Sequence, residues 1–301
     1  MAHFLQLVLN GLFVGAFYAL VALGYSMVYG IIKLLNFAHG DIYMLGAFTG
    51  YTLLTAGSGA LASGGGLLAL VLVMALAMLT TGLFGIVLER VAYRPLRSAP
   101  RLSILITAVG ASFAIEYGVA STFGPNPRAY PVTISGGAIS VLGARITVSQ
   151  IVMVVIAVVL MVALDTLVRK TRSGRAMRAI SQDPRACLLM GVNVDAVISR
   201  TFFIGSALAG AAGVMAGTYY GKIDFLMGFI IGLKAFTAAV IGGIGNIRGA
   251  VLGAVVLGLL ESFGTAMLGS QWRDVFAFAF LILFLTFRPT GLLGERVTER
   301  V

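Results

Sequence analysis

Residues 4–32 read FLQLVLNGLFVGAFYALVALGYSMVYGII and contain no charged side chain. A transmembrane helix needs about 20 consecutive, mostly apolar residues, and this stretch exceeds that length. A secretory signal would end in a small-residue cleavage site before a water-soluble body, whereas further apolar stretches follow here. We therefore expect a retained membrane-spanning helix and not a removed signal peptide.

The composition of the whole chain agrees with this start. Of its 301 residues, 59% are hydrophobic and 11% are charged, and the mean hydropathy is +1.01. A water-soluble domain of this length could hardly bury so much apolar surface in one core. The formal net charge is +10, but the basic residues gather in loops beside apolar stretches. This distribution indicates a lipid bilayer, and no nucleic acid, as the partner.

We predict an all-α, polytopic transmembrane helical bundle with about eight to nine spans, in a single domain over residues 1–301. The second span is the weakest, because Asn36, His39 and Asp41 interrupt its start, so that it is either broken or re-entrant. The predicted spans are residues 4–32, 40–57, 66–88, 102–123, 147–165, 198–220, 227–245, 249–268 and 272–287.

Small residues recur at every fourth position in and just after the stretch 198–220. They are Gly205, Ala209, Gly213, Gly217 and Gly221. Such stripes allow the backbones of two membrane helices to approach closely, so we interpret them as a packing face. A functional kink at one of the glycines is the alternative.

A short internal similarity links residues 36–46 with residues 246–253. Both begin with a polar cluster between two apolar segments. Paired, interrupted helices of this kind often form inverted repeats around a site at the middle of the bilayer. A possible internal inverted repeat is one interpretation, and chance similarity is the other.

Arginine and lysine gather in two loops, residues 89–101 and 169–200. Short loops rich in these residues stay on the cytoplasmic side of a membrane. The loop between the fourth and fifth spans then faces outward. Counting the spans backward from these basic loops places the N-terminus outside. Counting them forward places the C-terminal tail, residues 288–301, in the cytoplasm.

Ionisable residues inside apolar stretches need a reason, because a charge at the centre of a membrane helix costs about 2.5–3.5 kcal/mol on insertion scales. Glu116 and Lys234 lie well inside two predicted spans, and Asn36, His39 and Asp41 begin another. These five residues are candidates for a polar translocation path. The alternatives are a structural pair in the bundle, a misplaced span boundary and, for His39 and Asp41, a polar break that suits a helix start.

No residue pattern predicts catalysis, a metal site or a cofactor. The only histidine besides His39 is His3, and the only cysteine is Cys187, so metal ligands of these types are lacking and no internal disulfide forms. Residues 217–223 and 243–249 are similar to phosphate-binding loops, but each lacks residues or context that such loops require. We expect a protein that is not an enzyme and that binds no nucleotide itself.

The basic segment, about residues 169–198, also contains a helix pattern. Asp183 before Pro184 is typical of an N-cap and a first helical turn, and Gly191 of a helix stop. A short helix at the cytoplasmic face would suit a groove on a partner, whereas the alternative is a solvated or headgroup-bound loop that only sets topology. The candidate docking residues are Gly174, Arg175, Arg178, Asp183, Pro184, Arg185, Ala186 and Gly191.

Four ordered blocks give the chain a family resemblance. They are NFAHGD at 36–41, ERVAYRPLR at 89–97, the basic loop continuing into TFFIGSALAGAAG at 201–213, and KAFTAAVIGGIG at 234–245. Over nearly the whole chain they resemble the LivH-type permeases of branched-chain amino-acid ABC importers. The basic loop resembles the ATPase-coupling region of that family, although Pro184, Arg185 and Ala186 stand where the wider ABC-permease pattern has Glu-Ala-Ala.

The resemblance implies a multi-pass permease of the bacterial inner (plasma) membrane that imports branched-chain amino acids with energy from ATP. It also implies three kinds of partner: a second, LivM-like permease, two cytoplasmic ABC ATPase subunits, and a periplasmic or tethered amino-acid-binding protein. The ATPases would hold the loop around residues 183–191. Two alternatives stay open: an ABC permease for urea, short amides or other amino acids, and a stand-alone secondary transporter or channel.

Overall fold

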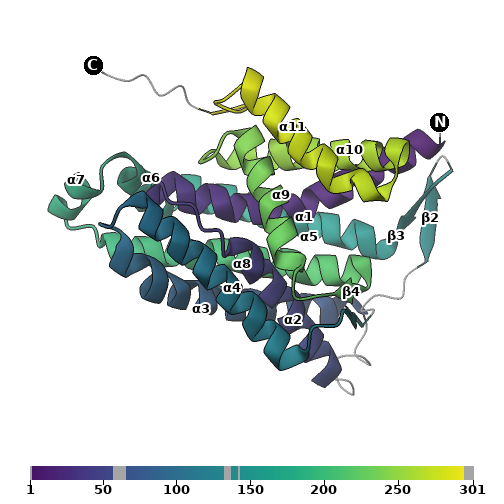
Figure 1. Ribbon diagram of the computed structural model, residues 1–301, viewed down its shortest axis with the longest axis horizontal. Coiled ribbons are helices and arrows are strands. Elements are labelled where there is room, and N and C mark those ends of the chain that lie inside the picture. Colours follow the sequence, from purple (N-terminus) through teal and green to yellow (C-terminus); the bar gives the residue numbers. More distant parts are fainter. Residues whose placement is uncertain (1, 57–65, 132–136, 142, 295–301) are drawn as a thin grey trace.

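The computed structural model describes residues 2–56, 66–131, 137–141 and 143–294, and these form a bundle of helices (Figure 1). The longer helices within these residues are α1 (Ala2–Ile32), α2 (His39–Ala56), α3 (Gly66–Leu88), α4 (Arg101–Phe123), α5 (Val148–Lys170), α8 (Val194–Tyr220), α9 (Met227–Gly242), α10 (Ile247–Leu268) and α11 (Arg273–Phe287).

Shorter elements join the long helices. The short helical ones are a π-helix η1 (Glu89–Tyr93), 3₁₀ turns η2 (Arg94–Leu96) and η3 (Ser270–Trp272), and the α-helices α6 (Arg172–Gln182) and α7 (Pro184–Leu189). Two antiparallel ribbons pair β1 (Arg128–Ala129) with β4 (Lys222–Ile223) and β2 (Ala138–Val141) with β3 (Ala144–Thr147).

Each predicted span overlaps one of the long helices. Seven helices in the described part are long and apolar enough to cross a membrane, and α9 is a shorter apolar helix. α2, the weakest predicted span, is not among the seven. The predicted all-α membrane bundle is therefore confirmed, while the inverted repeat stays a prediction.

Three predicted boundaries were wrong by three residues or more, and the largest difference is at the end of α5, which continues to Lys170 instead of residue 165. The other two have local reasons. α8 begins at Val194 instead of residue 198, because the Asn193 side chain accepts a hydrogen bond from Ala196 N (3.0 Å) and caps the helix earlier. α9 ends at Gly242 instead of residue 245, because Gly243 has a φ of +103°, which no α-helix accommodates.

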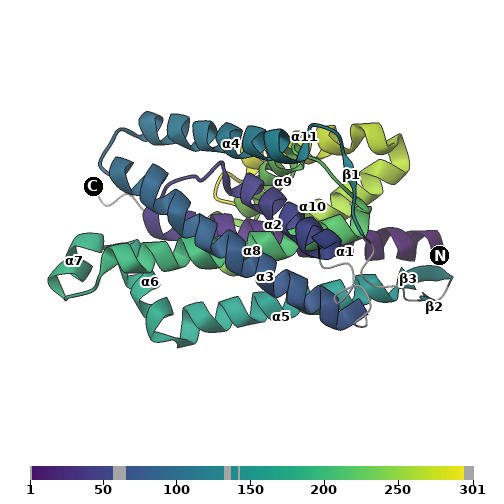
Figure 2. The same cartoon turned by 90° about the horizontal axis from the view of Figure 1, so that it is seen from below.

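α1 and α8 form the centre of the bundle. Every residue from 13 to 28 in α1 is buried, and Figure 2 shows α4 and α5 on opposite sides of this central pair. A helix that is buried all round can be apolar all round. The continuous apolar run at residues 13–28 therefore reflects this central position.

The small-residue stripe is the packing face of α8, as predicted. A Cβ atom on Gly213 would lie 2.1 Å from the carbonyl oxygen of Tyr43 in α2, and one on Gly205 would lie 3.3 Å from the Cα atom of Gly24 in α1. The helix backbones thus touch where a side chain would separate them. Gly221 is the exception, because it ends α8 with a left-handed φ of +65°.

α2 begins inside the bundle. Residues 33–38 are not helical, and the first residue of α2, His39, lies so close to α1 that a Cβ on Gly24 would be 2.2 Å from its Nε2. The same turn meets α9 through glycines, since a Cβ on Gly40 would lie 2.3 Å from the carbonyl oxygen of Gly228. The predicted interruption before the second span is therefore a real break, placed between α1 and α9.

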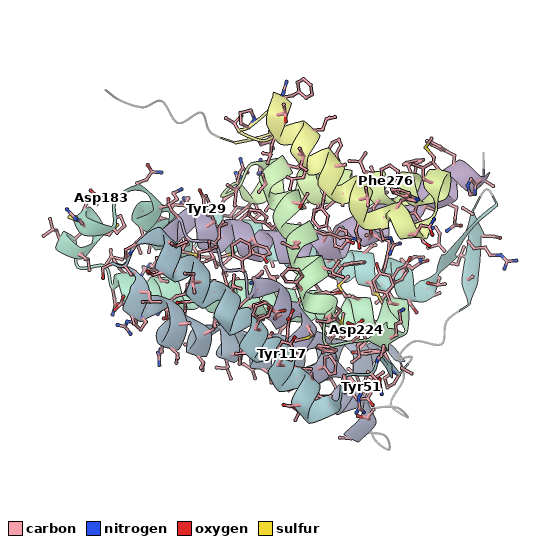
Figure 3. The ribbon with its side chains drawn as sticks, viewed as in Figure 1. Tyr29, Tyr51, Tyr117, Asp183, Asp224 and Phe276 are labelled. Carbon is pink, nitrogen blue, oxygen red and sulfur yellow. The ribbon has the colours of Figure 1, made fainter. Side chains whose placement is uncertain are left out.

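The two ends of the bundle carry different segments. At one end, Gln6 Nε2 donates to the carbonyl oxygen of Arg145 (3.1 Å), so the start of α1 lies beside the β2–β3 ribbon. At the other end, α6 and α7 project from the bundle, and Asp183 marks the tip (Figure 3). The segment after α11 returns to the C-terminal end of α9, where Leu293 N donates to Gly242 O (2.9 Å).

We predict that Gly213→Val destabilises the folded chain by about 1–3 kcal/mol or more, because the new side chain would overlap the backbone of α2. Gly110→Val is the matched control, since α4 exposes Gly110 and a Cβ there meets nothing within 4 Å. The measurement is the temperature at which half of the monodisperse size-exclusion peak in detergent is lost. Equal temperatures for the two variants would contradict this packing.

Candidate functional site

The projecting loop contains the predicted short helix. Asp183 Oδ1 accepts hydrogen bonds from Arg185 N (2.8 Å) and Ala186 N (3.0 Å), and Pro184 occupies the first turn of α7. The helix is followed by Gly191, whose φ is +78°. The predicted N-cap, first turn and left-handed stop are all confirmed as local structure.

The base of the loop is anchored to α5. A Cβ on Gly174 would lie 2.2 Å from the carbonyl oxygen of Val168, and Arg178 donates to the same carbonyl oxygen. Arg175 and Arg185 are exposed. Gly174 and Arg178 therefore set the angle at which α6 leaves α5, while the exposed arginines are available to lipid or to a partner.

An apolar surface covers the outer part of the loop. Leu188, Leu189 and Met190 are 59%, 89% and 83% exposed, respectively. Large apolar side chains exposed together on a basic loop are typical of an interaction site. Sequence reasoning chose the arginines and missed these residues, although three successive apolar residues at the end of a predicted amphipathic helix were the available signal.

Polar side chains gather where α2 begins. Asp41 is fully buried and its Oδ2 accepts a hydrogen bond from Ser112 Oγ of α4 (2.5 Å). Glu116, one turn further along α4, is also buried and lies close enough to interact electrostatically with Asp41. Asn36 Oδ1 accepts from the Tyr93 hydroxyl (2.7 Å). The structure thus brings Asp41, at the start of the second span, close to Glu116 of the fourth span.

Several polar atoms at this place have no hydrogen-bond partner among the described residues. They are Asn36 Nδ2, His39 Nε2, Asp41 Oδ1 and Glu116 Oε1. Buried polar groups in proteins are nearly always paired, so each such atom needs an explanation. A polar solute or water passing this place would find several unmet donors and acceptors.

Lys234, the remaining candidate, belongs to a different cluster. Its Nζ lies 2.8 Å from Glu261 Oε1 of α10 and 2.5 Å from Asp274 Oδ1 of α11. Arg273 Nε also contacts Glu261 Oε1 (2.9 Å), and the Tyr18 hydroxyl donates to Glu261 Oε2 (2.8 Å). Two cations therefore balance two anions. Sequence reasoning found Lys234 but missed Glu261, although a lone acid in the apolar stretch 249–268 was a visible signal.

No group of three or more His, Cys, Asp or Glu residues that could hold a metal lies among the described residues.

We predict that Lys234→Met destabilises the chain by about 3 kcal/mol, because it leaves the buried Glu261 carboxylate without one of its cations. The double variant Lys234→Met/Glu261→Gln should recover part of the loss, since it restores the charge balance. The measurement is the midpoint of thermal unfolding in detergent.

Arg169→Met is the control for this comparison. It removes a pair with Asp165 in which both side chains are partly exposed, and such surface pairs contribute about 0–1 kcal/mol. A double variant less stable than Lys234→Met alone would count against charge balance as the cause.

Comparisons with known proteins show the family to which the chain belongs. Residues 7–285 match the family model described as branched-chain amino acid transport system / permease component. The chain is 44% identical over 307 residues to the high-affinity branched-chain amino acid transport system permease protein BraD of Pseudomonas aeruginosa, covering 99% of this chain and 98% of the relative. It is 42% identical over 309 residues to the corresponding protein LivH of Escherichia coli K12, with the same coverage. No solved structure matches the chain. The chain belongs to the family of permease components of branched-chain amino acid transport systems.

Proposed function

We propose that this permease component carries branched-chain amino acids across the bacterial inner membrane as part of an ATP-driven importer. The full-length similarity to BraD and LivH supports this substrate class, because both relatives are named as high-affinity branched-chain amino acid permeases. The proposed partners are a second, LivM-like permease, two cytoplasmic ABC ATPase subunits and a periplasmic or tethered amino-acid-binding protein.

The projecting loop is the proposed ATPase-docking element. The observation that carries this proposal is the exposed surface of Leu188, Leu189 and Met190 at the tip of a loop whose inner residues, Met177 and Ile180, are buried. An apolar helix end of this kind suits a hydrophobic groove on a partner. The exposed Arg175 and Arg185 would surround that contact with positive charge.

The buried polar atoms at the start of α2 support a translocation path at this place. Transport sites in membranes often lie where a helix is broken, because the free backbone and side-chain groups can then meet a polar solute. Asn36, His39, Asp41 and Glu116 are the proposed lining. Lys234 is not part of it in this proposal, because its charge is already balanced by Glu261 and Asp274.

The proposed topology has the N-terminus outside and the C-terminus in the cytoplasm. Two observations support it. The loops 89–101 and 169–200 are joined by the salt bridge between Arg97 and Asp195 (2.6 Å), so both lie at one end of the bundle. The start of α1 contacts Arg145 at the other end.

We predict that Leu189→Glu lowers leucine uptake by about tenfold or more, the effect of losing about 1.4 kcal/mol of docking energy. Gln182→Glu is the matched control, because it adds the same charge to an exposed position of the same loop without removing an apolar contact. The measurement is uptake of labelled leucine, isoleucine and valine into vesicles that contain the whole importer, with ATPase co-purification as the assay of docking.

Two substitutions of Gly191 also test the docking of the loop. Gly191→Leu should impair docking because a left-handed conformation costs ordinary residues about 1–2 kcal/mol, whereas Gly191→Asn should keep it, since asparagine tolerates this conformation.

Normal uptake by Leu189→Glu, or uptake by this chain without ATPases, would overturn the proposed function. Stronger competition by urea or an amide than by leucine would reassign the substrate.

We predict that a membrane-impermeant thiol reagent labels Ser140→Cys but not Ser181→Cys in intact cells whose outer membrane has been permeabilised. Both variants carry Cys187→Ser, so that the introduced thiol alone reacts. Ser140 lies in β2 at the end of the bundle that holds the start of α1, and Ser181 lies in α6 at the opposite end. Labelling of Ser181→Cys alone would invert the proposed topology.

A further inference from the structure

A chain of polar contacts leads from the projecting loop into the bundle. It begins at the groove beneath α7, which is lined by Leu188, Gly191 and Arg97 among other residues. Arg97 Nη1 lies 2.6 Å from Asp195 Oδ1 in the first turn of α8. Arg97 therefore holds the end of the loop at residues 191–195 against the turn that follows α3.

The second step joins the same arginine to the start of η1, directly after α3. The other terminal nitrogen of Arg97 bonds to Glu89, whose side chain is fully buried. Glu89 Oε2 also accepts a hydrogen bond from Ser199 Oγ of α8 (2.7 Å). Glu89 is thus held by the turn after α3 on one side and by α8 on the other.

The third step passes through the π-helix η1, which begins at Glu89 and ends at Tyr93. Single π-turns are rare and occur often at functional sites. Tyr93 is buried, its ring packs against Phe202 of α8 with centroids 5.4 Å apart, and its hydroxyl donates to Asn36 Oδ1 (2.7 Å).

The last step reaches the start of α2. The carbonyl oxygen of Asn36 accepts a hydrogen bond from His39 N (3.1 Å), the first residue of α2. Asn36 therefore fixes the position at which the helix begins, and Asp41 follows in the first turn. The links Arg97–Glu89 and Tyr93–Asn36 are direct side-chain contacts, and the backbone of η1 joins Glu89 to Tyr93.

We propose that Arg97, Glu89 and Tyr93 are positioning residues that carry a displacement of the projecting loop to the start of α2. This inference rests on the proposed docking function of the loop and extends it to the residues that connect docking to the path. Tightly packed contacts have discrete arrangements and deform little, so a shift of α7 relative to α3 is passed on through the arginine and the π-turn.

These contacts join two of the sequence blocks that give the family resemblance. The block at 89–97 supplies Glu89, Tyr93 and Arg97, and the block at 36–41 supplies Asn36. The two blocks are far apart in sequence, and the Tyr93–Asn36 hydrogen bond is where they meet.

The test uses the assembled importer in vesicles, with amino acid uptake and ATP hydrolysis measured on the same preparation. Tyr93→Phe removes one hydroxyl group and keeps the ring that packs on Phe202. We expect ATPase binding and hydrolysis to stay within about twofold of the values for the unmodified importer. The ratio of amino acid imported to ATP hydrolysed should fall by at least about fivefold. Arg97→Gln should give the same pattern.

Tyr29→Phe is the matched control, since it makes the same chemical change at the same end of the bundle and keeps the ring beneath Lys33 Nζ (5.8 Å). Combining Tyr93→Phe with Asn36→Ala tests the last link. If the two residues act through one contact, the import ratio of the double variant should be little lower than that of either single variant. Size exclusion shows whether a variant is folded. If Arg97→Gln is unfolded, Arg97→Lys takes its place, because it keeps the positive charge. Arg97→Lys is expected to lower the import ratio less than Arg97→Gln.

The outcomes separate this inference from the function it rests on. A normal import ratio in both Tyr93→Phe and Arg97→Gln, together with impaired docking in Leu189→Glu, would overturn the positioning role and leave the docking loop intact. Normal docking in Leu189→Glu would overturn the docking proposal itself. A reduced ratio in Tyr93→Phe but not in Tyr29→Phe supports the relay.

Discussion

Close contact between helix backbones is the constraint on which this structure depends. Hydrocarbon offers no hydrogen-bond partners, so the chain crosses it as helices, and these associate by packing more than by hydrophobic exclusion. Between α2 and α8 the packing leaves no space for side chains, since a Cβ on Gly46 would lie 2.4 Å from the Cα of Gly210. Because α2 is held this tightly to α8, its interrupted start can lie inside the bundle, against α1 and α9.

The buried polar clusters around Glu261 and Asp41 differ in charge balance, and this difference suits them to different roles. Around Glu261, two cations meet two anions and a tyrosine hydroxyl, so the cluster connects α1, α9, α10 and α11 with its charges satisfied. Around Asp41, two acids meet a serine hydroxyl, and several polar atoms lack partners in the described residues. A balanced network resists change because removing one member leaves a buried charge. The acidic cluster is the place where a passing polar group would change the hydrogen bonding.

Sequence reasoning recovered features that are set locally and missed those that depend on distant partners. The apolar stretches, the cap at Asp183 and the stop at Gly191 follow from neighbouring residues, and the structure confirms them as elements. Glu116 and Lys234 are both buried in the bundle, which agrees with the high cost of a charge that faces lipid. Glu261 was visible as a lone acid in an apolar stretch, but its pairing with Lys234 was not foreseeable, because Lys234 meets Glu261 and Asp274 only after α9, α10 and α11 pack. The π-turn at Glu89 was hidden for the same reason, since it carries no local sequence signature.

Two sets of polar contacts each join several helices of the bundle. Arg97 and Glu89 join the turn after α3 to α8, and the cluster around Glu261 joins α9, α10 and α11 to α1. Where α2 meets α9, Gly40 faces Gly228 and Gly232 with backbone against backbone. A contact without interlocking side chains opposes sliding less than one with them, because no rotamer has to change for the surfaces to move. We therefore expect α2 and α9 to move relative to one another at this glycine contact, beside Asp41, where the unpaired polar atoms of the candidate path lie.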